Sequence, residues 1–318
     1  EVESPRGYLL NESWYTFTIG NDTHYNYTTY GAFITVYCED APIKGQIEVN
    51  KIGEKVEIEN GTFSYKEKSL SNVKFNIYAR EDIKTSDGNH LYYEKDSLVD
   101  TITTNENGYA ISGELPLGKY YLVEIETQKG YVLDSEEYDF ELSEKDNKTR
   151  IVYVGYSKLN YLEKGTLEFS KTDVATSEGI KDTKIEVYTN DDELIFTGLT
   201  DENGKVIIKD LFVGKFYIIE TEASTGYKIS NEKVFFEIKE NGEIVKANMT
   251  NEKIKGDFEL TKQDISTEET LPNALIEVYN ESDELIFSGK TDENGKITIK
   301  DLTYGKYYFL EKEAPEGY

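Results

Sequence analysis

A glutamate recurs at one position of a repeated phrase in this sequence. The phrase reads FYIIETEASTGY at residues 216–227. In its four copies the glutamate stands seven residues before the last tyrosine: Glu1, Glu124, Glu220 and Glu311. In a strand, Glu220 would share with Phe216 and Ile218 the face that is expected to be buried. A carboxyl group held away from water can keep a proton and pass it on.

A lysine precedes three of these glutamates. It stands 49 residues before the glutamate in two copies and 73 residues before it in a third: Lys171, Lys262 and Lys51. In the strand pattern LEFSK, Lys171 lies on the apolar face with Leu167 and Phe169. In a single copy, a lysine could extend its amine to solvent beside a glutamate at a strand end. Because three copies keep the same register, we expect each repeat to bury one lysine and one glutamate.

An amide or acid side chain stands eleven residues before each lysine: Asp40, Asn160 and Asn251. Each is followed at the fifth position by the glycine of a Lys-Gly pair. Strand alternation directs Asn251 inward together with Ala247 and Met249. The same alternation predicts a strand over residues 30–40 with one inward face, formed by Ile34, Val36, Cys38 and Asp40. Cys38 is therefore expected to be a buried core thiol.

An internal repeat supplies the elements that position these residues. Two near-copies are offset by 91 residues and match through IEVY, ELIF, TDENGK and KDL, and a third copy starts at 44–51 with an insertion near 76–100. The Asn-Gly steps near Gly108, Gly204 and Gly295 predict tight hairpins with both central residues at positive φ. Short alternating runs between such turns predict tandem all-β, immunoglobulin-like sandwiches in a linear array. The expected domains are a truncated C-terminal part (1–44), two complete domains (45–164 and 165–255) and a truncated N-terminal part (256–318).

Composition excludes several classes of function. The net charge of −27 disfavours nucleic acid and anionic membranes as partners. The single cysteine forms no internal disulfide, and no apolar run is long enough to enter a membrane. His24 and His90 lie in polar, loop-like stretches, and the TDENG loop lacks the alternating oxygens of a calcium site. We therefore expect that the chain binds no metal and no cofactor and that it is not an enzyme. A glycosidase with paired catalytic carboxylates is the least favoured interpretation.

The lysine of a first strand, the glutamate of the phrase and the asparagine of a last strand resemble the Cna B-type domain. This domain is also called the prealbumin-like or SpaA-type pilin domain of Gram-positive surface proteins. The resemblance covers essentially the whole chain and implies spontaneous isopeptide bonds, Lys51–Asn160 assisted by Glu124 and Lys171–Asn251 assisted by Glu220. The end modules carry incomplete sets: Glu1 with Asp40, and Lys262 with Glu311. The family's Ala-Pro is complete only at 314–315. The copies with Thr127-Gln128 and Ala223-Ser224 depart from it at turn positions expected not to touch the chemistry.

The chemistry explains why these residue types are needed. Apolar burial disfavours the charged lysine, so the amine becomes a nucleophile, and it favours a protonated carboxyl that can shuttle protons to the departing ammonia. The bond forms once per molecule, so this is a self-reaction and not enzyme catalysis.

These features together predict a stalk segment of a cell-surface adhesin or pilin-like protein. We expect a monomeric rod that lies outside the cell and is anchored to the cell wall through parts not present in this chain. The alternative is a ligand-binding region that contacts host or surface molecules through the insertion at 76–100 and the tyrosine-rich segment 14–30. The end modules are expected to be locally disordered, or to pair head to tail between chains through Asp40 and Lys262.

Overall fold

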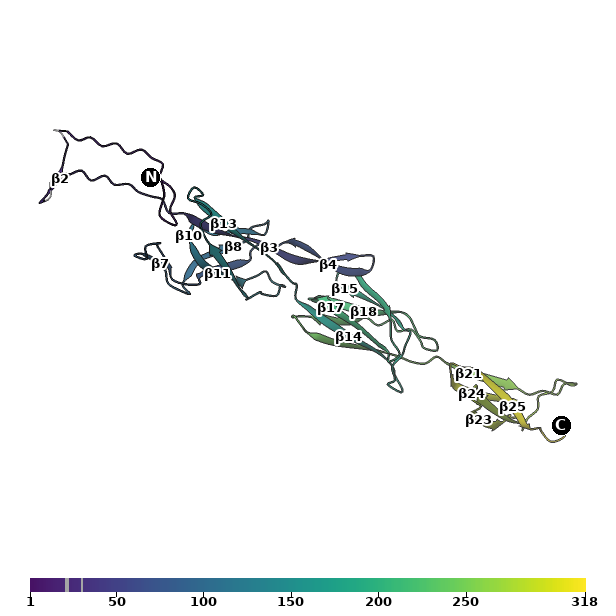
Figure 1. Cartoon of the computed structure of the whole chain (residues 1–318). Helices are drawn as coiled ribbons and strands as arrows, with labels where there is room; N and C mark the ends of the chain where they lie inside the picture. The colour runs from purple at the N-terminus through teal and green to yellow at the C-terminus, as the bar shows by residue number, and fades with distance from the viewer. Residues whose placement is uncertain (21–22, 30) are drawn as a thin grey trace. The chain divides into compact units, whose positions relative to one another are not determined.

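The computed structural model describes residues 1–20, 23–29 and 31–318. These residues form strands, turns and loops, and no helix occurs among them, so the all-β prediction is confirmed. The chain divides into two compact units, residues 1–57 with 65–163 and residues 58–64 with 164–318. Figure 1 shows the strands of each unit.

A sandwich of two sheets forms the body of the first unit. One sheet is built on β3 (Lys44–Glu59), which pairs in parallel with β13 (Ile151–Asn160). Three further strands pair with β3: β4 (Thr62–Ser69), β9 (Tyr109–Ile111) and β10 (Leu115–Pro116). The other sheet has the order β12 (Glu137–Leu142), β11 (Gly118–Glu126), β5 (Lys74–Ala79) and β8 (Leu98–Thr103). Two small hairpins complete the unit, β1 (Asn26–Thr28) with β2 (Gly31–Phe33), and β6 (Ile83–Lys84) with β7 (Leu91–Tyr93).

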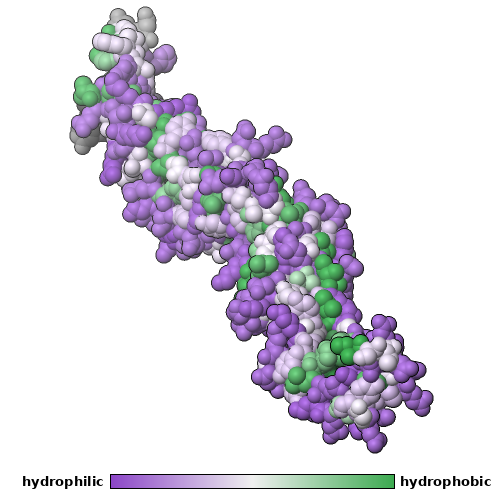
Figure 2. Space-filling view, turned by 90° about the vertical axis from the view of Figure 1, so that its right-hand side faces the viewer, coloured by the Kyte–Doolittle hydropathy of each residue, from purple (hydrophilic) through white to green (hydrophobic). Residues whose placement is uncertain are grey.

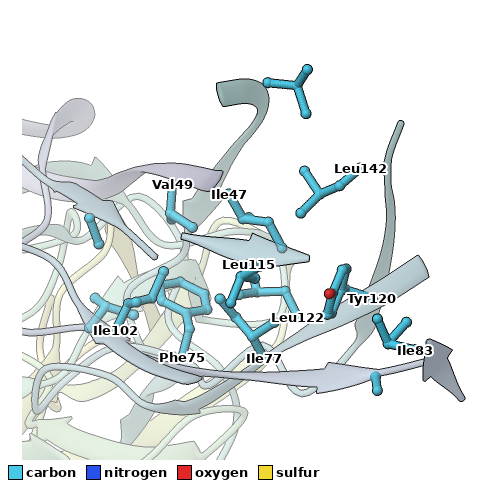
Figure 3. Packing of buried hydrophobic residues seen from close by; sticks show 14 of the residues in the cluster. Ile47, Val49, Phe75, Ile77, Ile83, Ile102, Leu115, Tyr120, Leu122 and Leu142 are labelled. Atoms are coloured by element: carbon cyan, nitrogen blue, oxygen red, sulfur yellow. The ribbon is translucent and has the colours of Figure 1, made fainter. Parts of the chain in front are cut away.

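The core of this sandwich follows from strand alternation. Every second residue of β5 is buried, and the same holds for β3 over its first eight residues. In Figure 3, Ile47 and Val49 on β3 lie across the core from Phe75 and Ile77 on β5. Apolar residues at alternating positions of both sheets thus fill the space between them.

The second unit contains a sandwich of the same design. In one sheet, β14 (Lys164–Asp173) lies between β17 (Lys205–Phe212), which is antiparallel, and β20 (Ile244–Asn251), which is parallel. The other sheet has the order β16 (Leu194–Leu199), β15 (Lys184–Thr189), β18 (Gly214–Glu222) and β19 (Val234–Ile238). A parallel pairing between the first and last strands therefore recurs in both sandwiches.

A third module of the same unit repeats part of this design. β21 (Lys255–Thr261) pairs with β24 (Lys296–Thr303). β22 (Leu275–Asn280) lies between β23 (Leu285–Lys290) and β25 (Tyr307–Glu313). Among the strands described here, none corresponds to β19 or β20 in this module.

The extra length of the first repeat is distributed differently from what we expected. The hairpin of β6 and β7 lies in the region 76–100, but β3 and β4 form a second, longer hairpin where the second repeat has a short loop. The tip of this hairpin, residues 58–64, belongs to the second unit. There Ile58 and Phe63 pack against the apolar core, and the Phe63 and Phe212 ring centroids lie 5.8 Å apart.

The Asn-Gly turns also differ from the prediction. Gly108, Gly204 and Gly295 have φ of 74°, 72° and 66°, but the asparagine before each glycine is not at positive φ. The Gly204 amide donates to the Asp201 carbonyl, so the asparagine lies inside a four-residue turn that ends at the glycine. A type I turn followed by a left-handed glycine needs only one residue at positive φ.

The predicted strand over 30–40 is present only over Gly31–Phe33, which form β2, and residue 30 lies outside the described residues. Residues 34–40 form no strand; Ile34 and Asp40 are half-buried, and the Cys38 thiol is exposed instead of buried. In the two sandwiches the corresponding strands, β13 and β20, pair with the strand that carries the lysine, and no such pairing of residues 34–40 occurs in the described part of the chain. An extended segment without a neighbouring strand forms no inter-strand hydrogen bonds, and neither of its faces is covered.

The surface is mostly polar. The face seen in Figure 2 is largely hydrophilic, with apolar residues in small patches. This agrees with 62 acidic against 35 basic side chains in the chain. Such a surface is well solvated and carries a strong negative potential.

Candidate cross-linking sites

The second sandwich holds a closed triangle of polar side chains in its core. Lys171, Glu220 and Asn251 are at most 5% exposed. The Lys171 amine donates to Asn251 Oδ1 at 2.7 Å and to Glu220 Oε2 at 2.9 Å. Asn251 Nδ2 donates to Glu220 Oε1 at 2.6 Å. An amine, a carboxamide and a carboxyl group thus contact one another with water excluded.

Strand register explains how these three residues meet. On the parallel strands β14 and β20, Lys171 is opposite Met249, and Asn251 is two residues further along on the same face. Glu220 comes from the facing sheet, where it pairs with Ile185 on β15. The sandwich therefore brings the carboxyl group across the core onto the lysine and the amide.

Burial changes the acid–base behaviour of the lysine. Loss of solvent lowers the pKa of Lys171, and the neighbouring carboxylate of Glu220 opposes this shift without cancelling it. A larger share of this amine is therefore neutral, and nucleophilic, than of an exposed lysine. The backbone amide of Ser230 donates to Glu220 Oε2 at 2.9 Å and fixes the carboxyl group further.

The first sandwich contains the corresponding set with a different arrangement of hydrogen bonds. Lys51, Glu124 and Asn160 are at most 2% exposed. The Lys51 amine lies 2.9 Å from Glu124 Oε2, although the two groups are not aligned as a hydrogen bond. Asn160 Nδ2 donates to Glu124 Oε1 at 2.6 Å and to Thr127 Oγ1 at 3.0 Å. The expectation that Thr127 does not touch the chemistry is therefore wrong, because the turn folds its hydroxyl back onto the amide.

The lysine and glutamate of the third module also form an ion pair. Lys262 Nζ lies 2.8 Å from Glu311 Oε2, but the two side chains are 30% and 32% exposed. The prediction of a buried pair is wrong for this copy. In the second sandwich β19 lies beside β18 and β20 beside β14, and the edges of β25 and β21 carry no such neighbours among the described residues.

Two acidic residues of the first module, Glu1 and Asp40, also lie together. The pKa of Asp40 is raised by partial burial and by the adjacent Glu1 carboxyl, with which it shares a hydrogen bond. The structure therefore brings Glu1 next to Asp40, although Asp40 is not on a strand.

Sequence reasoning missed a glycine that holds each lysine. The backbone amides of Lys51, Lys171 and Lys262 donate to the carbonyl of a hairpin glycine at 2.7, 2.7 and 2.8 Å; the glycines are Gly108, Gly204 and Gly295. The repeated ENG triplets were visible in the sequence, but their contact with the lysine strand required the fold.

The tyrosine and glycine of the repeated phrase have structural roles. The Tyr227 hydroxyl donates to Asp173 Oδ2 at 3.0 Å, and the Tyr131 hydroxyl donates to the Glu54 carbonyl at 2.5 Å. The glycine before each tyrosine is at positive φ, between 81° and 97°, in all four copies. The phrase therefore ends in a turn that ties the glutamate strand to residues just after the lysine.

A second lysine near the first site, Lys158, is partly exposed and paired with carboxylates. Lys158 is opposite Lys51 in the parallel ladder, but its side chain is 32% exposed. Its amine lies 2.6 Å from Asp134 and 2.9 Å from Glu136, and these carboxylates raise the pKa of Lys158. Lys158 is thus held in the charged form, which is not nucleophilic.

Other kinds of site have little support. In residues 1–20, 23–29 and 31–318, no group of three His, Cys, Asp or Glu side chains could hold a metal ion. No helix that could cross a membrane occurs in the same part of the chain.

The fold and these sites define a class: repeated β-sandwiches in which a first-strand lysine, a last-strand amide and a facing glutamate meet in the core. Comparison of the sequence with protein families gives the name. The chain belongs to the SpaA family of prealbumin-like fold domains, whose sequence model matches residues 45–156, 165–253 and 256–318.

Relatives of known name agree with this assignment. The chain is 27% identical over 344 residues to a bone sialoprotein-binding protein of Staphylococcus aureus. It is 28% identical over 342 residues to serine-aspartate repeat-containing protein E of the same species. Each match covers 92% of this chain but only 28% of the relative. Among solved structures, the Bacillus anthracis TIE protein is 32% identical with a TM-score of 0.65, over 86% of this chain and 46% of that one.

Proposed function

We propose that the chain is a stalk segment of a surface adhesin or pilin-like protein, and that each complete sandwich is braced by a self-formed amide bond. The bonds join Lys51 to Asn160 and Lys171 to Asn251. The observation that carries this proposal is the buried triangle of Lys171, Glu220 and Asn251, in which nucleophile, proton carrier and leaving group are already in contact.

The triangle supports a balanced reaction. The neutral Lys171 amine attacks Cγ of Asn251, and Glu220 accepts a proton from the amine and delivers it to Nδ2. The bond from Cγ to Nδ2 breaks, one ammonia leaves, and an amide remains between Nζ and Cγ. Because both reactants are held in one core, their effective concentration can reach ~10⁵ M or more. No external reagent is consumed.

The position of the bond suits a mechanical role. It would join the first and last strands of a sandwich and close a loop that spans 80 residues in the second one. By the loop-entropy relation for cross-links this stabilises the fold by about 4–5 kcal/mol. The linked residues of successive sandwiches, Asn160 and Lys171, are only eleven positions apart. A pulling force would therefore pass from bond to bond and bypass the interior of each sandwich.

The family and the relatives support a location on the outside of a Gram-positive cell. We propose that the segment extends from the cell wall and that other parts of a longer protein supply the anchor. A covalent brace that resists reductants suits such a place, because this chain has one cysteine and cannot use internal disulfides.

Peptide mapping tests the proposal. Proteolysis of the unfolded protein should release a branched peptide that contains Lys171 and Asn251 and lacks one ammonia. A second branched peptide should contain Lys51 and Asn160. Recovery of all four residues only in linear peptides of unmodified mass would remove the cross-linking function.

One observation favours a second candidate function, ligand binding by the first unit. A cavity of about 290 Å³ lies between residues 6–8, the hairpin of β6 and β7 and the end of β12. Its wall includes Tyr92, with the Lys44 amine 5.2 Å from the ring centroid. The segment 14–30 also exposes aromatic rings, although Asn21, Asp22 and Tyr30 lie outside the described residues.

A binding measurement separates this candidate from a purely structural role. One relative is named for binding bone sialoprotein, so bone sialoprotein is the first probe. If the cavity is a binding site, Tyr92→Ala should weaken binding while Tyr109→Ala, an exposed tyrosine away from the cavity, should not. Equal binding by both variants and the parent would exclude the cavity.

A further inference from the structure

Thr127 distinguishes the first cross-linking site from the second. Asn160 Nδ2 uses both of its hydrogens, one on Glu124 Oε1 at 2.6 Å and one on Thr127 Oγ1 at 3.0 Å. The matching position of the second phrase is Ala223, which has no hydroxyl. There, Glu220 is the only acceptor of Asn251 Nδ2 seen among the described residues.

The opposite end of the amide shows the complementary difference. Asn251 Oδ1 accepts a hydrogen bond from the Lys171 amine at 2.7 Å. Asn160 Oδ1 is buried and has no hydrogen-bond partner among the described residues, and Lys51 does not donate to it. Both sites hold the amide nitrogen on the glutamate. The second site adds a contact from the lysine to the amide oxygen, and the first site adds a contact from the amide nitrogen to the threonine.

We propose that Thr127 is a positioning residue for bond formation between Lys51 and Asn160: it orients the carboxamide so that the leaving nitrogen faces Glu124. This inference rests on the proposed function and adds a residue that acts at one site only.

The Thr127 hydroxyl can accept a hydrogen bond from Nδ2 throughout bond formation. As the Lys51 amine attacks Cγ, Nδ2 must take a proton from Glu124 before it can leave as ammonia. Thr127 Oγ1 already accepts from Nδ2, and it can accept equally from the –NH₃⁺ group that forms on proton transfer. Without this acceptor the contact of Nδ2 with Glu124 Oε1 alone would fix which end of the buried amide faces the carboxyl group, because Lys51 does not hold the oxygen.

A time course in newly made protein tests the proposal. The full chain is synthesised in a cell-free system, samples are quenched in acid denaturant, and branched and linear peptides are quantified. The bond between Lys171 and Asn251 serves as an internal clock in the same molecules. Thr127→Val keeps the shape but removes the acceptor, and it should slow the first bond about fivefold, the rate equivalent of one hydrogen bond. Thr127→Ser should restore the parent rate.

A matched variant and a stability measurement exclude a general folding effect. Thr221→Val removes a hydroxyl next to Glu220 that donates to the Lys184 carbonyl, not to Asn251, and it should leave both rates unchanged. Thr127→Val in a Glu124→Gln background, where no first bond forms, should keep the urea midpoint of Glu124→Gln alone. A midpoint that falls there would make Thr127 a folding residue and overturn its positioning role.

The remaining outcomes are distinguishable. If both bonds form in the parent and Thr127→Val links at the parent rate, the positioning role is wrong and the proposed function stands. If Thr127→Val slows both bonds equally, the effect is not local and the inference also fails. If the parent forms neither bond, the proposed function fails together with the inference.

Discussion

The backbone of Lys171 is held by Gly204. The lysine amide donates to the glycine carbonyl at 2.7 Å, and a Cβ atom on Gly204 would lie 2.3 Å from the Lys171 carbonyl oxygen. The hairpin between β16 and β17 therefore directly contacts the backbone of the residue that carries the nucleophile.

A methyl group at this glycine should disturb the second site. Gly204→Ala combines a strained φ of 72° with a backbone clash, so it should destabilise the second sandwich by about 1–3 kcal/mol and slow the bond to Asn251. Chemical unfolding and peptide mapping measure the two effects. Gly242→Ala is the control, because it has φ of 79° but nothing within 4 Å of its Cβ. Equal loss in both variants would assign the effect to strain alone.

Removal of the proton carrier should abolish one bond and leave the fold. Glu220→Ala should restore the mass of one ammonia and lower the melting temperature, because Lys171 and Asn251 lose the group that moves protons between them. Glu222→Ala, which removes only an exposed partner of Lys184, should change neither quantity. Normal bond formation without Glu220 would show that the lysine and the amide react unaided.

Loss of the amide should cost the stabilisation of the closed loop. Asn251→Ala should lower the free energy of unfolding by about 4–5 kcal/mol, and added reductant should not change the stability of the parent. Asn248→Ala, an exposed position on the same strand, is the matched control. A loss no larger than that of the control would mean that no covalent loop exists.

The unlinked site should show a characteristic pH dependence. Burial lowers the pKa of Lys171 below its ordinary value of 10.5, so in Asn251→Ala the unfolded chain binds more protons than the folded chain between these two pKa values. Stability should therefore rise with pH through this window and level off near 10.5. Urea midpoints measure the rise. It should vanish in the double variant Lys171→Met with Asn251→Ala, and a rise that persists there would assign it to other groups.

The sequence was sufficient to predict the position of those residues whose burial depends on the alternation of side chains along a strand. Lys171, Glu220 and Asn251 lie on faces with apolar neighbours, and alternation alone places such residues in one core. Thr127 could not be found in this way, because the direction of a turn side chain depends on the path of the chain in three dimensions. The prediction of a strand over residues 34–40 was wrong for a related reason. An alternating pattern forms a strand only where a neighbouring strand accepts its hydrogen bonds.

The exposure of Lys262 also could not be predicted from the repeat pattern. The register of β21 and β25 is the same as in the second sandwich, but burial depends on strands that cover the pair from both edges. Similar local sequence therefore gave the same ion pair with different access to water.

The intact mass of the unfolded chain tests the central claim most directly. We predict a mass lower than that of the sequence by two ammonias, one for each of the bonds Lys51–Asn160 and Lys171–Asn251. The variant Asn251→Ala should retain the loss of one ammonia, from the first sandwich alone. A parent mass equal to that of the unmodified sequence would contradict the account, because the buried amines would then have remained free.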